Sequence, residues 1–522
     1  MFLKKEELKN DLHRENFSRY LPWLAYDGEF YYNQDDTVGF ILMSMPTYIA
    51  GGKIFDSLKG LLSYSYPNKT IIQFILTADD YIEPFLIEYE RRKVRANPLV
   101  RKAIEKYKNF LRESAKAGKV RQFRFFVAVK CPMSVGREKM VEIKENFVDR
   151  FKGMGMPVEL LPPEGLLGWL RYIFNRELNG TYDENVFIKD QVITKRIEQD
   201  FNKFMLGERY GKTFTVKAFP KEINDLTSNL MSGGIWGAQS DLEQIKGNFI
   251  LSFNFIYEED LKNKLLAKGN YILFQKGFLG FAQSLAQKQE EVNWMIKSMN
   301  EGEKFIRVIP SVVVFGENES NLKEVVSSVK RVFEGLGFYM QEEYGINLPI
   351  FLLSLPHGLY YEAVKDINRD FIFSISTATR LIPLQADFAG NGASLVLIGR
   401  KGQIGGIDIF DKNAINYNMV ITASSGAGKS FFVNYIVFNV YAEGGIIRII
   451  DIGGSYKKLV KMLGAKYIDI AQEQVCLNPF SFIKEEEDFK GVVSVVSSMA
   501  NVEEESIEYR LIQDAVRLAY EQ

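Results

Sequence analysis

The stretch from Ala423 to Ser430, Ala-Ser-Ser-Gly-Ala-Gly-Lys-Ser, has the residue types and spacing of a phosphate-binding loop. Glycines before a helix let successive backbone N–H groups approach an anion, with the positive end of the helix behind them. Lys429 is then expected to reach the β- and γ-phosphates of a nucleotide, and the Ser430 hydroxyl to coordinate Mg²⁺. The loop departs from the strict G-x-x-x-x-G-K-[ST] pattern only at its first position, where the small residue Ala423 replaces glycine.

The flanking residues supply the elements that such a loop needs. Residues 417–421 form a short apolar run that predicts a strand, and residues 431–441 repeat apolar side chains at helical spacing. Gly444 and Gly445 are expected to end that helix. A chance match in a Gly- and Ser-rich loop would not bring this context with it.

Further elements of the same kind follow the loop. Residues 446–450 and 467–470 predict strands, and residues 457–463 predict the helix between them. Strands that alternate with helices favour an α/β domain with a parallel, covered sheet. Asp451 follows the first of these strands, so it is expected to line the nucleotide side at the carboxyl edge of the sheet, or alternatively to support Mg²⁺. The predicted nucleotide-binding residues are therefore Ser424, Ser425, Gly426, Ala427, Gly428, Lys429, Ser430, Phe431 and Asp451, with Lys429 and Ser430 as the catalytic ones and Ser430 as the Mg²⁺ ligand.

Composition describes a large globular protein without a strong net charge. The chain has 522 residues, 46% of them hydrophobic, which is enough for several cores. Its 65 basic and 66 acidic residues give a net charge of −1, so there is no global attraction to nucleic acid or to an anionic membrane, although a local basic face remains open. Two distant cysteines, Cys131 and Cys476, indicate free thiols rather than a disulfide framework. No run of about 18 apolar residues occurs, so membrane attachment is expected only through partners.

The region before the loop mixes strand-like and helix-like segments, which predicts an α+β architecture. We expect four segments: an N-terminal α+β unit at 1–180, a second α+β unit at 181–355, a linker with lead-in strands at 356–410, and the P-loop domain at 411–522.

A pattern recurs within this region and suggests an internal duplication. In each copy a helix with apolar residues four apart is followed by Gly-x-Gly and an apolar residue. The alternative is coincidence, because glycine often ends helices and apolar i, i+4 stripes are common. The first copy contains Ile143, Phe147, Phe151, Gly153 and Gly155, and the second contains Val325, Val329, Phe333, Gly335 and Gly337.

Taken in order, the motifs of the chain resemble those of the conjugative-transfer ATPases of type IV secretion systems, in particular the F-type, TraC-like branch. The resemblance extends along essentially the whole chain, and its specificity lies in the ordered series. The motifs are LPWLAYD at 21–27, LIPL at 381–384, GRKGQ at 399–403, SGAGKS at 425–430, DIGGSY at 451–456 and NPF at 478–480.

This resemblance implies a RecA-like ATPase that uses ATP and Mg²⁺. It also implies a bacterial, cytoplasmic protein that docks through its N-terminal region on inner-membrane secretion components, and that self-associates from dimers to hexamers. Members of the family continue further and carry an Asp-Glu motif after an apolar strand and a later arginine. Neither is recognisable after Ser430, so we expect the motor domain to be incomplete here.

Three functions remain open at this stage. The first is an ATP-driven motor for assembly or secretion, and the second is a nucleotide-binding structural subunit with little hydrolysis, which the missing catalytic glutamate favours. The third is a DNA translocase, against which the near-neutral charge counts. A GTPase is disfavoured, because residues 451–454 satisfy D-x-x-G but no N-K-x-D motif accompanies them.

Overall fold

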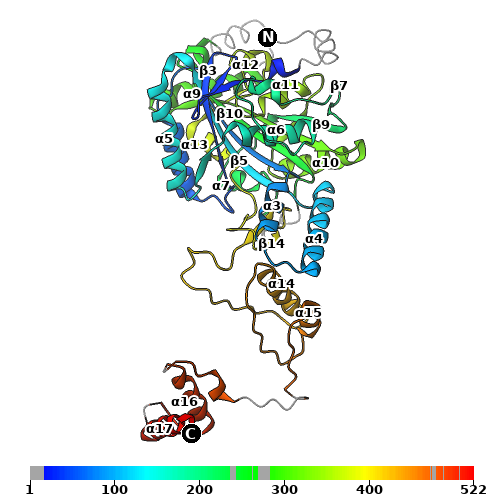
Figure 1. Ribbon diagram of the computed structural model, residues 1–522. Helices are drawn as coiled ribbons and strands as arrows, with labels where there is room; N and C mark the ends of the chain where they lie inside the picture. The colour runs from blue at the N-terminus through cyan, green and yellow to red at the C-terminus, as the bar shows by residue number, and fades with distance from the viewer. Residues whose placement is uncertain are drawn as a thin grey trace. The chain divides into compact units, whose positions relative to one another are not determined.

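The computed structural model describes residues 17–521 apart from 236–242, 262, 268–282, 471, 473–477, 486 and 505. The chain divides into two compact units, Met1–Arg448 and Ile449–Gln522. The first contains the large sheet with its covering helices and also α14 (Lys429–Ala442), the helix that follows the predicted phosphate loop (Figure 1).

One large sheet dominates the first unit. Its described strands run in the order β1-β2-β3-β5-β4-β10-β11-β9-β8-β7, and β6, β12 and β13 pair with β3, β9 and β11 respectively. Neighbouring strands in this sheet are antiparallel. The strands are β1 Trp23–Tyr26, β2 Tyr31–Asn33, β3 Thr37–Ser44, β4 Ile71–Asp79, β5 Gln122–Pro132, β6 Val158–Leu160, β7 Ile197–Gln199, β8 Phe204–Leu206, β9 Arg209–Ala218, β10 Asn248–Ile256, β11 Phe305–Gly316, β12 Tyr339–Glu342 and β13 Phe371–Ser374.

Helices cover both faces of this sheet. On β4, Phe74 and Leu76 belong to one hydrophobic core while Ile75 belongs to the other, as the two-residue period of a strand requires. Burial on both faces explains why the central strands carry apolar residues at consecutive positions. The first core is closed by α2 (Gly52–Leu62), α5 (Arg137–Gly153), α10 (Glu319–Gly335) and the segment 375–386, and the second by α6 (Pro163–Asn175) and α11 (Asn347–Leu353).

The strand order is palindromic. From one edge the order is β1-β2-β3-β5-β4, and from the other edge it is β7-β8-β9-β11-β10. The two series meet at the central pair, β4 with β10. Within each half the strands follow the split β-α-β order, β6-β3-β5-β4 in the first and β12-β9-β11-β10 in the second. The two halves thus place corresponding elements in corresponding positions.

The two helices with the repeated Gly-x-Gly pattern, α5 and α10, end in the same geometry. The amide of Met156 donates to the Phe151 carbonyl at 3.0 Å, and that of Phe338 donates to the Phe333 carbonyl at 2.9 Å. The second glycine of each pair has positive φ, +73° at Gly155 and +82° at Gly337, which a residue with a Cβ rarely adopts.

The other helices of the first unit connect these strands or follow them. Asn97 caps α4, and its side chain accepts a hydrogen bond from the Leu99 amide at 2.9 Å. A separate hairpin, β14 (Leu395–Ile398) with β15 (Ile404–Ile407), precedes α14. The helices are α3 Glu83–Arg91, α4 Pro98–Lys116, α7 Asp225–Leu230, α9 Gln283–Asn300, α12 Ala363–Ile367 and α13 Ile375–Ala378, and short 3₁₀ helices lie at Phe17–Tyr20, Met133–Val135, Ile188–Gln191 and Thr379–Leu381.

The second unit is helical in its described part. It contains α15 (Lys457–Leu463), as the sequence predicted, a 3₁₀ turn at Pro479–Phe482, and then α16 (Asp488–Met499) and α17 (Ile507–Glu521). Valines of α16 and α17 are buried together, which gives this unit a small core of its own.

The prediction of three strands around the loop is wrong for this structure. Residues 417–421, 446–450 and 467–470 are not in strands, and several of their apolar side chains are exposed, Val420 at 85% and Ile470 at 80%. A parallel strand forms only when neighbouring strands satisfy its backbone groups and its faces are covered. The strands that the structure describes include no neighbour for these runs. The protein therefore combines helices with sheet, but the sheet expected around the loop is not formed.

Candidate nucleotide-binding site

The predicted phosphate loop leads directly into α14. The helix begins at Lys429, two residues earlier than expected, and Phe432 donates its amide to the Gly428 carbonyl at 2.9 Å. Gly426 (φ +79°) and Gly428 (φ +93°) both have left-handed conformations. A Cβ built on either would meet no atom within 4 Å. Glycine is therefore needed here for its backbone conformation rather than for lack of space.

The loop residues are open to a ligand. Residues 422–431 are all exposed, and Lys429 makes no ion pair with any residue that the structure describes. The first amides of α14 have no partner within the helix, so they present the positive end of a 14-residue helix. These donors, the Lys429 ammonium and the Ser430 hydroxyl fit the phosphates and the Mg²⁺ ion of a bound nucleotide.

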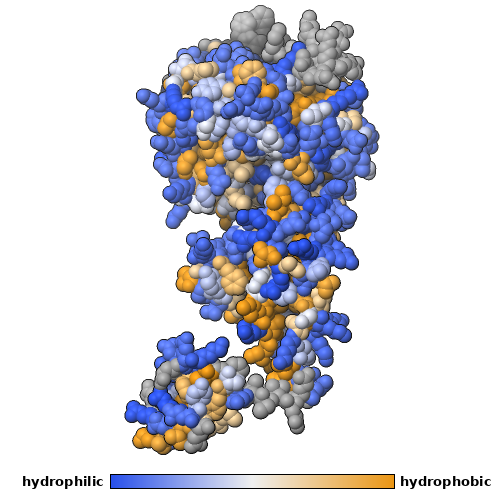
Figure 2. All heavy atoms as spheres, viewed as in Figure 1, coloured by the Kyte–Doolittle hydropathy of each residue, from blue (hydrophilic) through white to orange (hydrophobic). Residues whose placement is uncertain are grey.

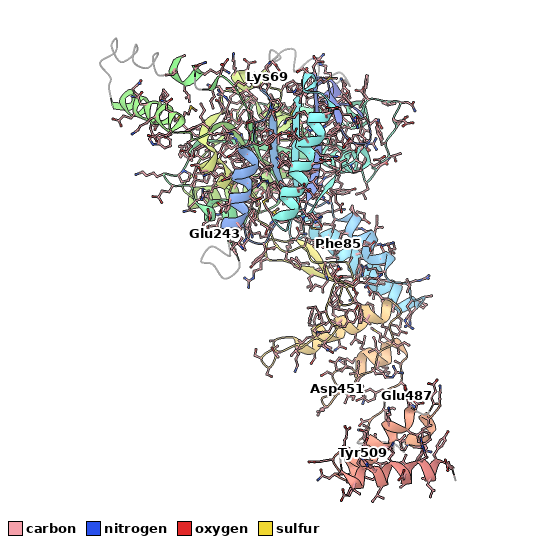
Figure 3. The ribbon with its side chains drawn as sticks, turned by 90° about the vertical axis from the view of Figure 1, so that its left-hand side faces the viewer. Lys69, Phe85, Glu243, Asp451, Glu487 and Tyr509 are labelled. Carbon is pink, nitrogen blue, oxygen red and sulfur yellow. The ribbon has the colours of Figure 1, made fainter. Side chains whose placement is uncertain are left out.

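Asp451 belongs to the second unit, where it is exposed before α15 (Figure 3). Its Oδ1 accepts a hydrogen bond from the Gly453 amide at 3.0 Å, so the side chain closes its own turn. The strand expected to end at Asp451 is absent from the described residues, and a contact between this carboxylate and the nucleotide stays a prediction.

From its middle to the residue that follows it, α14 is held by side-chain contacts that the sequence did not predict. Tyr435 contacts β14, Asn439 contacts α3, and Glu443 contacts the residues that follow α3. Asn439 is fully buried, although it lies in a helix that is largely apolar. A polar residue within such a helix was a sequence signal that could have indicated a contact of this kind.

Arg95 satisfies the end of the same helix. Its guanidinium donates to the Tyr441 carbonyl at 2.7 Å and to the Gly445 carbonyl at 3.0 Å. The last carbonyls of a helix have no partner within it, so this arginine supplies donors that the helix itself lacks.

Exposed apolar side chains lie just before α14 and in its first turn. Figure 2 shows hydrophobic residues on the outside of this part of the chain, and the side chain of Phe431 is 81% exposed. Phe431 was predicted to belong to the nucleotide site. Its place next to Ser430 and its exposure leave it available for that role, which stays a prediction.

Buried charges occur at the seam between the two halves of the large sheet. Asp80 accepts from Arg176 at 2.6 and 2.8 Å and from the Asn248 side chain at 2.9 Å. Burial would raise the pKa of Asp80, but Arg176 and then Arg209 outweigh it and hold this pKa below its usual value of 3.8. Burial, followed by the charge of Arg176, lowers the pKa of Arg209 to about 10.

The tip of the β14–β15 hairpin contacts the residue before β5 and the segment between α7 and β10. Lys401 is buried, and its ammonium donates to the Ser232 hydroxyl at 2.7 Å. The Arg121 amide donates to the Gly402 carbonyl at 2.7 Å, and the Arg121 guanidinium donates to the Ile245 carbonyl at 2.7 Å. Burial lowers the pKa of Lys401 to about 7. The GRKGQ motif thus ties the residues that precede the loop to the large sheet.

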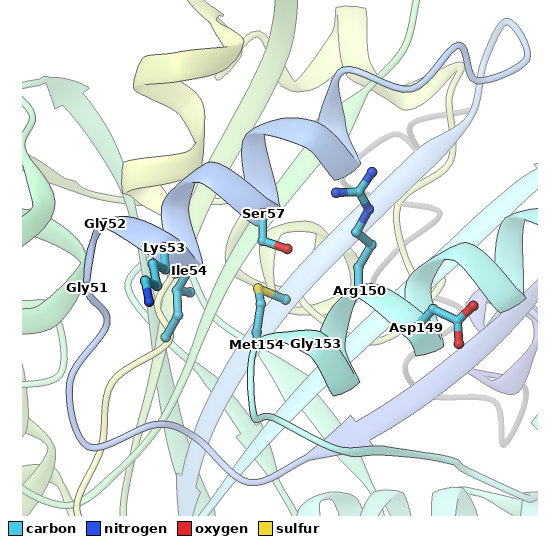
Figure 4. A pocket seen from close by; sticks show the side chains of 9 residues that line it. All are labelled: Gly51, Gly52, Lys53, Ile54, Ser57, Asp149, Arg150, Gly153 and Met154. Carbon is cyan, nitrogen blue, oxygen red and sulfur yellow. The ribbon is translucent and has the colours of Figure 1, made fainter.

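A cavity of about 670 Å³ opens between the start of α2 and the end of α5 (Figure 4). Ser57 and Met154 point toward each other within it, while Asp149 points away. The charged residues Lys53, Arg150 and Asp149 do not converge on one point, so the cavity offers no catalytic arrangement.

The described part of the chain contains no group of three or more His, Cys, Asp or Glu side chains that could hold a metal ion. None of its helices is both long and apolar enough to cross a membrane.

Two family models match successive parts of the chain. A family model described as "TraC protein" matches residues 17–359, and one described as "TraG P-loop domain" matches residues 402–522. The chain is similar to Protein TraC of Escherichia coli (strain K12), with 23% identity over 572 aligned residues. The match covers 99% of this chain but 64% of that protein, so the chain spans a little under two thirds of the length of this relative.

Proposed function

Because the chain belongs to the TraC family of conjugative-transfer proteins, we propose that it is an ATP-binding motor subunit. In this proposal it energises assembly or substrate transfer in a bacterial type IV secretion or conjugation system. The reaction is hydrolysis of ATP to ADP and phosphate with Mg²⁺ as cofactor.

One observation carries this proposal. Two glycines with positive φ precede a helix whose first residues are Lys429 and Ser430, and all of these residues are exposed. Lys429 pairs with the β- and γ-phosphates, Ser430 binds Mg²⁺, and the amides of 424–428 surround the β-phosphate. A RecA-like fold of residues 411–522 is part of this proposal, although the strands predicted around the loop do not form in this structure.

The proposed setting follows from the family. The subunit self-associates, from dimers up to hexamers, at the cytoplasmic face of the inner membrane, where its N-terminal region contacts other secretion components. DNA or protein is the substrate that the assembled system moves. Since the curated relative is longer than this chain, these properties are proposed for the whole protein.

A second candidate is a nucleotide-binding structural subunit that hydrolyses little ATP. The position of Asp451 supports it, because this carboxylate closes a turn of the second unit instead of ending a strand. A RecA-like DNA translocase is a third candidate, and the net charge of −1 gives it no support.

We also propose that the large sheet arose by internal duplication. The palindromic strand order and the matched ends of α5 and α10 support this origin. Both halves would then descend from one split β-α-β unit.

The test is equilibrium titration of the purified chain with Mg·ATP, followed by measurement of phosphate release at saturation. Specific binding together with turnover supports the motor, and binding without turnover supports the structural subunit. An absence of binding that persists at millimolar Mg·ATP would contradict both.

A further inference from the structure

We propose that Tyr435 and Glu443 are positioning residues for the phosphate loop, which hold α14 against β14 and the residues that follow α3 and so set the nucleotide affinity. This inference rests on the proposed function, since it concerns the same site. It joins the ATP site to α3, α4 and the β14–β15 hairpin through named contacts.

Tyr435 binds one residue of β14 twice. Its hydroxyl donates to the Val396 carbonyl at 2.9 Å and accepts from the Val396 amide at 2.8 Å. The N–H and C=O of one strand residue point to the same side of the strand. Those of Val396 point toward Tyr435, and thus away from β15, the partner strand of β14. The tyrosine hydroxyl therefore takes the place of a neighbouring strand. Tyr107 of α4 packs edge-on against the same ring at 6.2 Å.

Glu443 makes the second anchor, directly after the end of α14. Its carboxylate accepts from the Lys93 ammonium at 2.7 Å and from the Ser394 hydroxyl at 2.9 Å. Lys93 also donates to the Ser394 carbonyl at 2.7 Å, and its side chain is only 1% exposed. Burial lowers the pKa of Lys93, and the contact with Glu443 opposes that shift. Removing either partner would leave the other charge buried and unpaired.

These anchors lie on one face of α14. Tyr435, Asn439 and Glu443 are four residues apart, so their side chains line up along the helix. Between the two anchors, Asn439 accepts from the Tyr89 hydroxyl at 3.0 Å. The face that meets α3 and β14 is thus polar, with Asn439 buried and with Tyr435 and Glu443 partly buried.

The opposite end of the helix is exposed, together with the loop at 422–431. Lys429 lies six residues before Tyr435, about 9 Å along a rigid helix at 1.5 Å per residue. The anchors therefore fix the direction in which the loop amides and Lys429 point. If the nucleotide binds more tightly when Tyr435 and Glu443 hold α14 in place, thermodynamic linkage requires that the bound nucleotide stabilises these contacts in return.

The experiment uses the full chain with four variants: Tyr435→Phe, Glu443→Gln, the double variant of these two, and Tyr441→Phe as the matched control. Tyr441 is on the same helix and its ring lies 4.1 Å from the Arg95 guanidinium, but its hydroxyl makes no hydrogen bond to the described residues. Mg·ATP affinity is measured by calorimetry. We expect the double variant to bind at least about fivefold more weakly and the control to stay within about twofold. The double variant loses both hydrogen bonds of the Tyr435 hydroxyl and the negative charge that faces Lys93, whereas the control loses neither.

A second measurement is the rate of hydrogen exchange at the Val396 amide, which donates to Tyr435. If Tyr435 had only a structural role, this rate would be the same with and without bound nucleotide. Saturating Mg·ATP should slow this exchange in the unmodified chain, and the slowing should be absent in Lys429→Ala. This measurement decides the question even if the double variant fails to fold.

The outcomes separate the two proposals. If the unmodified chain does not bind Mg·ATP, or Lys429→Ala binds equally well, the proposed function is wrong. If the unmodified chain binds, Lys429→Ala does not, and the folded double variant matches the control in affinity, the positioning role is wrong. An unchanged Val396 exchange rate on binding would overturn it as well.

Discussion

Replacing Asp80 with asparagine should destabilise the first unit strongly. Asp80 follows β4 at the seam of the two sheet halves and is 5% exposed. Its charge faces Arg176, which it binds at 2.6 and 2.8 Å, and the buried Arg209, whose three guanidinium nitrogens form no hydrogen bond in the described structure. Asparagine keeps the volume but removes the buried negative charge that faces both cations.

The magnitude follows from the cost of an unpaired buried charge. Breaking a buried ion pair by removing one partner typically costs about 3–5 kcal/mol. The Asn248 bond at 2.9 Å is also weakened, because its acceptor is no longer charged. Arg176 and Arg209 both retain an ion pair with the half-exposed Glu317, which keeps the expected loss at about 3 kcal/mol rather than above 5.

The assay is urea unfolding followed by a probe in the first unit, with Asp56→Asn as control. Asp56 is exposed on α2 and makes no ion pair with the described residues. The midpoint should fall at constant m for Asp80→Asn and stay unchanged for the control.

The pH dependence of the same measurement has a definite sign. The lowered pKa of Asp80 means that its charge stabilises the fold above pH 3.8, and that this contribution is lost as pH falls through the folded value. The unmodified chain and Asp80→Asn should therefore converge in acid. A difference below about 0.5 kcal/mol at pH 7 would refute the account.

Three further predictions concern the loop. Lys429→Ala should weaken Mg·ATP binding by about tenfold to a hundredfold while the thermal transition stays unchanged, because an exposed side chain loses only its phosphate contacts; equal affinity in titration would contradict the assignment. Ser430→Ala should remove the Mg²⁺ dependence of nucleotide binding, measured by titration with and without the ion, and a retained dependence would exclude Ser430 as the ligand. The unmodified chain should release phosphate orders of magnitude more slowly than about 10 s⁻¹, because neither a catalytic glutamate nor an arginine finger is recognisable in it. An arginine finger alone raises the rate by a factor of about 10³ to 10⁵ in related enzymes. Turnover near 10 s⁻¹, with Lys429→Ala as blank, would show that the catalytic groups are already present.

Local patterns in the sequence were sufficient for the periodic elements. The stripe of Ile143, Phe147 and Phe151 predicted α5, and all three side chains are fully buried. The helix after the loop was equally clear, because apolar side chains at helical spacing follow a run of small residues. α14 begins within two residues of its expected start.

Features that depend on distant partners could not be predicted in this way. The apolar run at 417–421 makes a strand possible, but whether the strand forms depends on neighbours that must be present in space. The burial of Lys401 is another case, since the sequence shows a lysine in a Gly-rich turn while its acceptor Ser232 lies far away in the chain. The palindromic strand order likewise arises only from long-range pairing.

The central pairing of β4 with β10 has a consequence for biosynthesis. Every residue of β4 is buried in the finished protein, and its neighbour β10 lies far downstream in the chain. A chain made from its N-terminus completes β3, β4 and β5 while one edge of β4 still has unpaired amides and carbonyls. Until β10 leaves the ribosome, strands of other nascent chains can pair with that edge. A chaperone that covered the edge during synthesis would prevent this pairing.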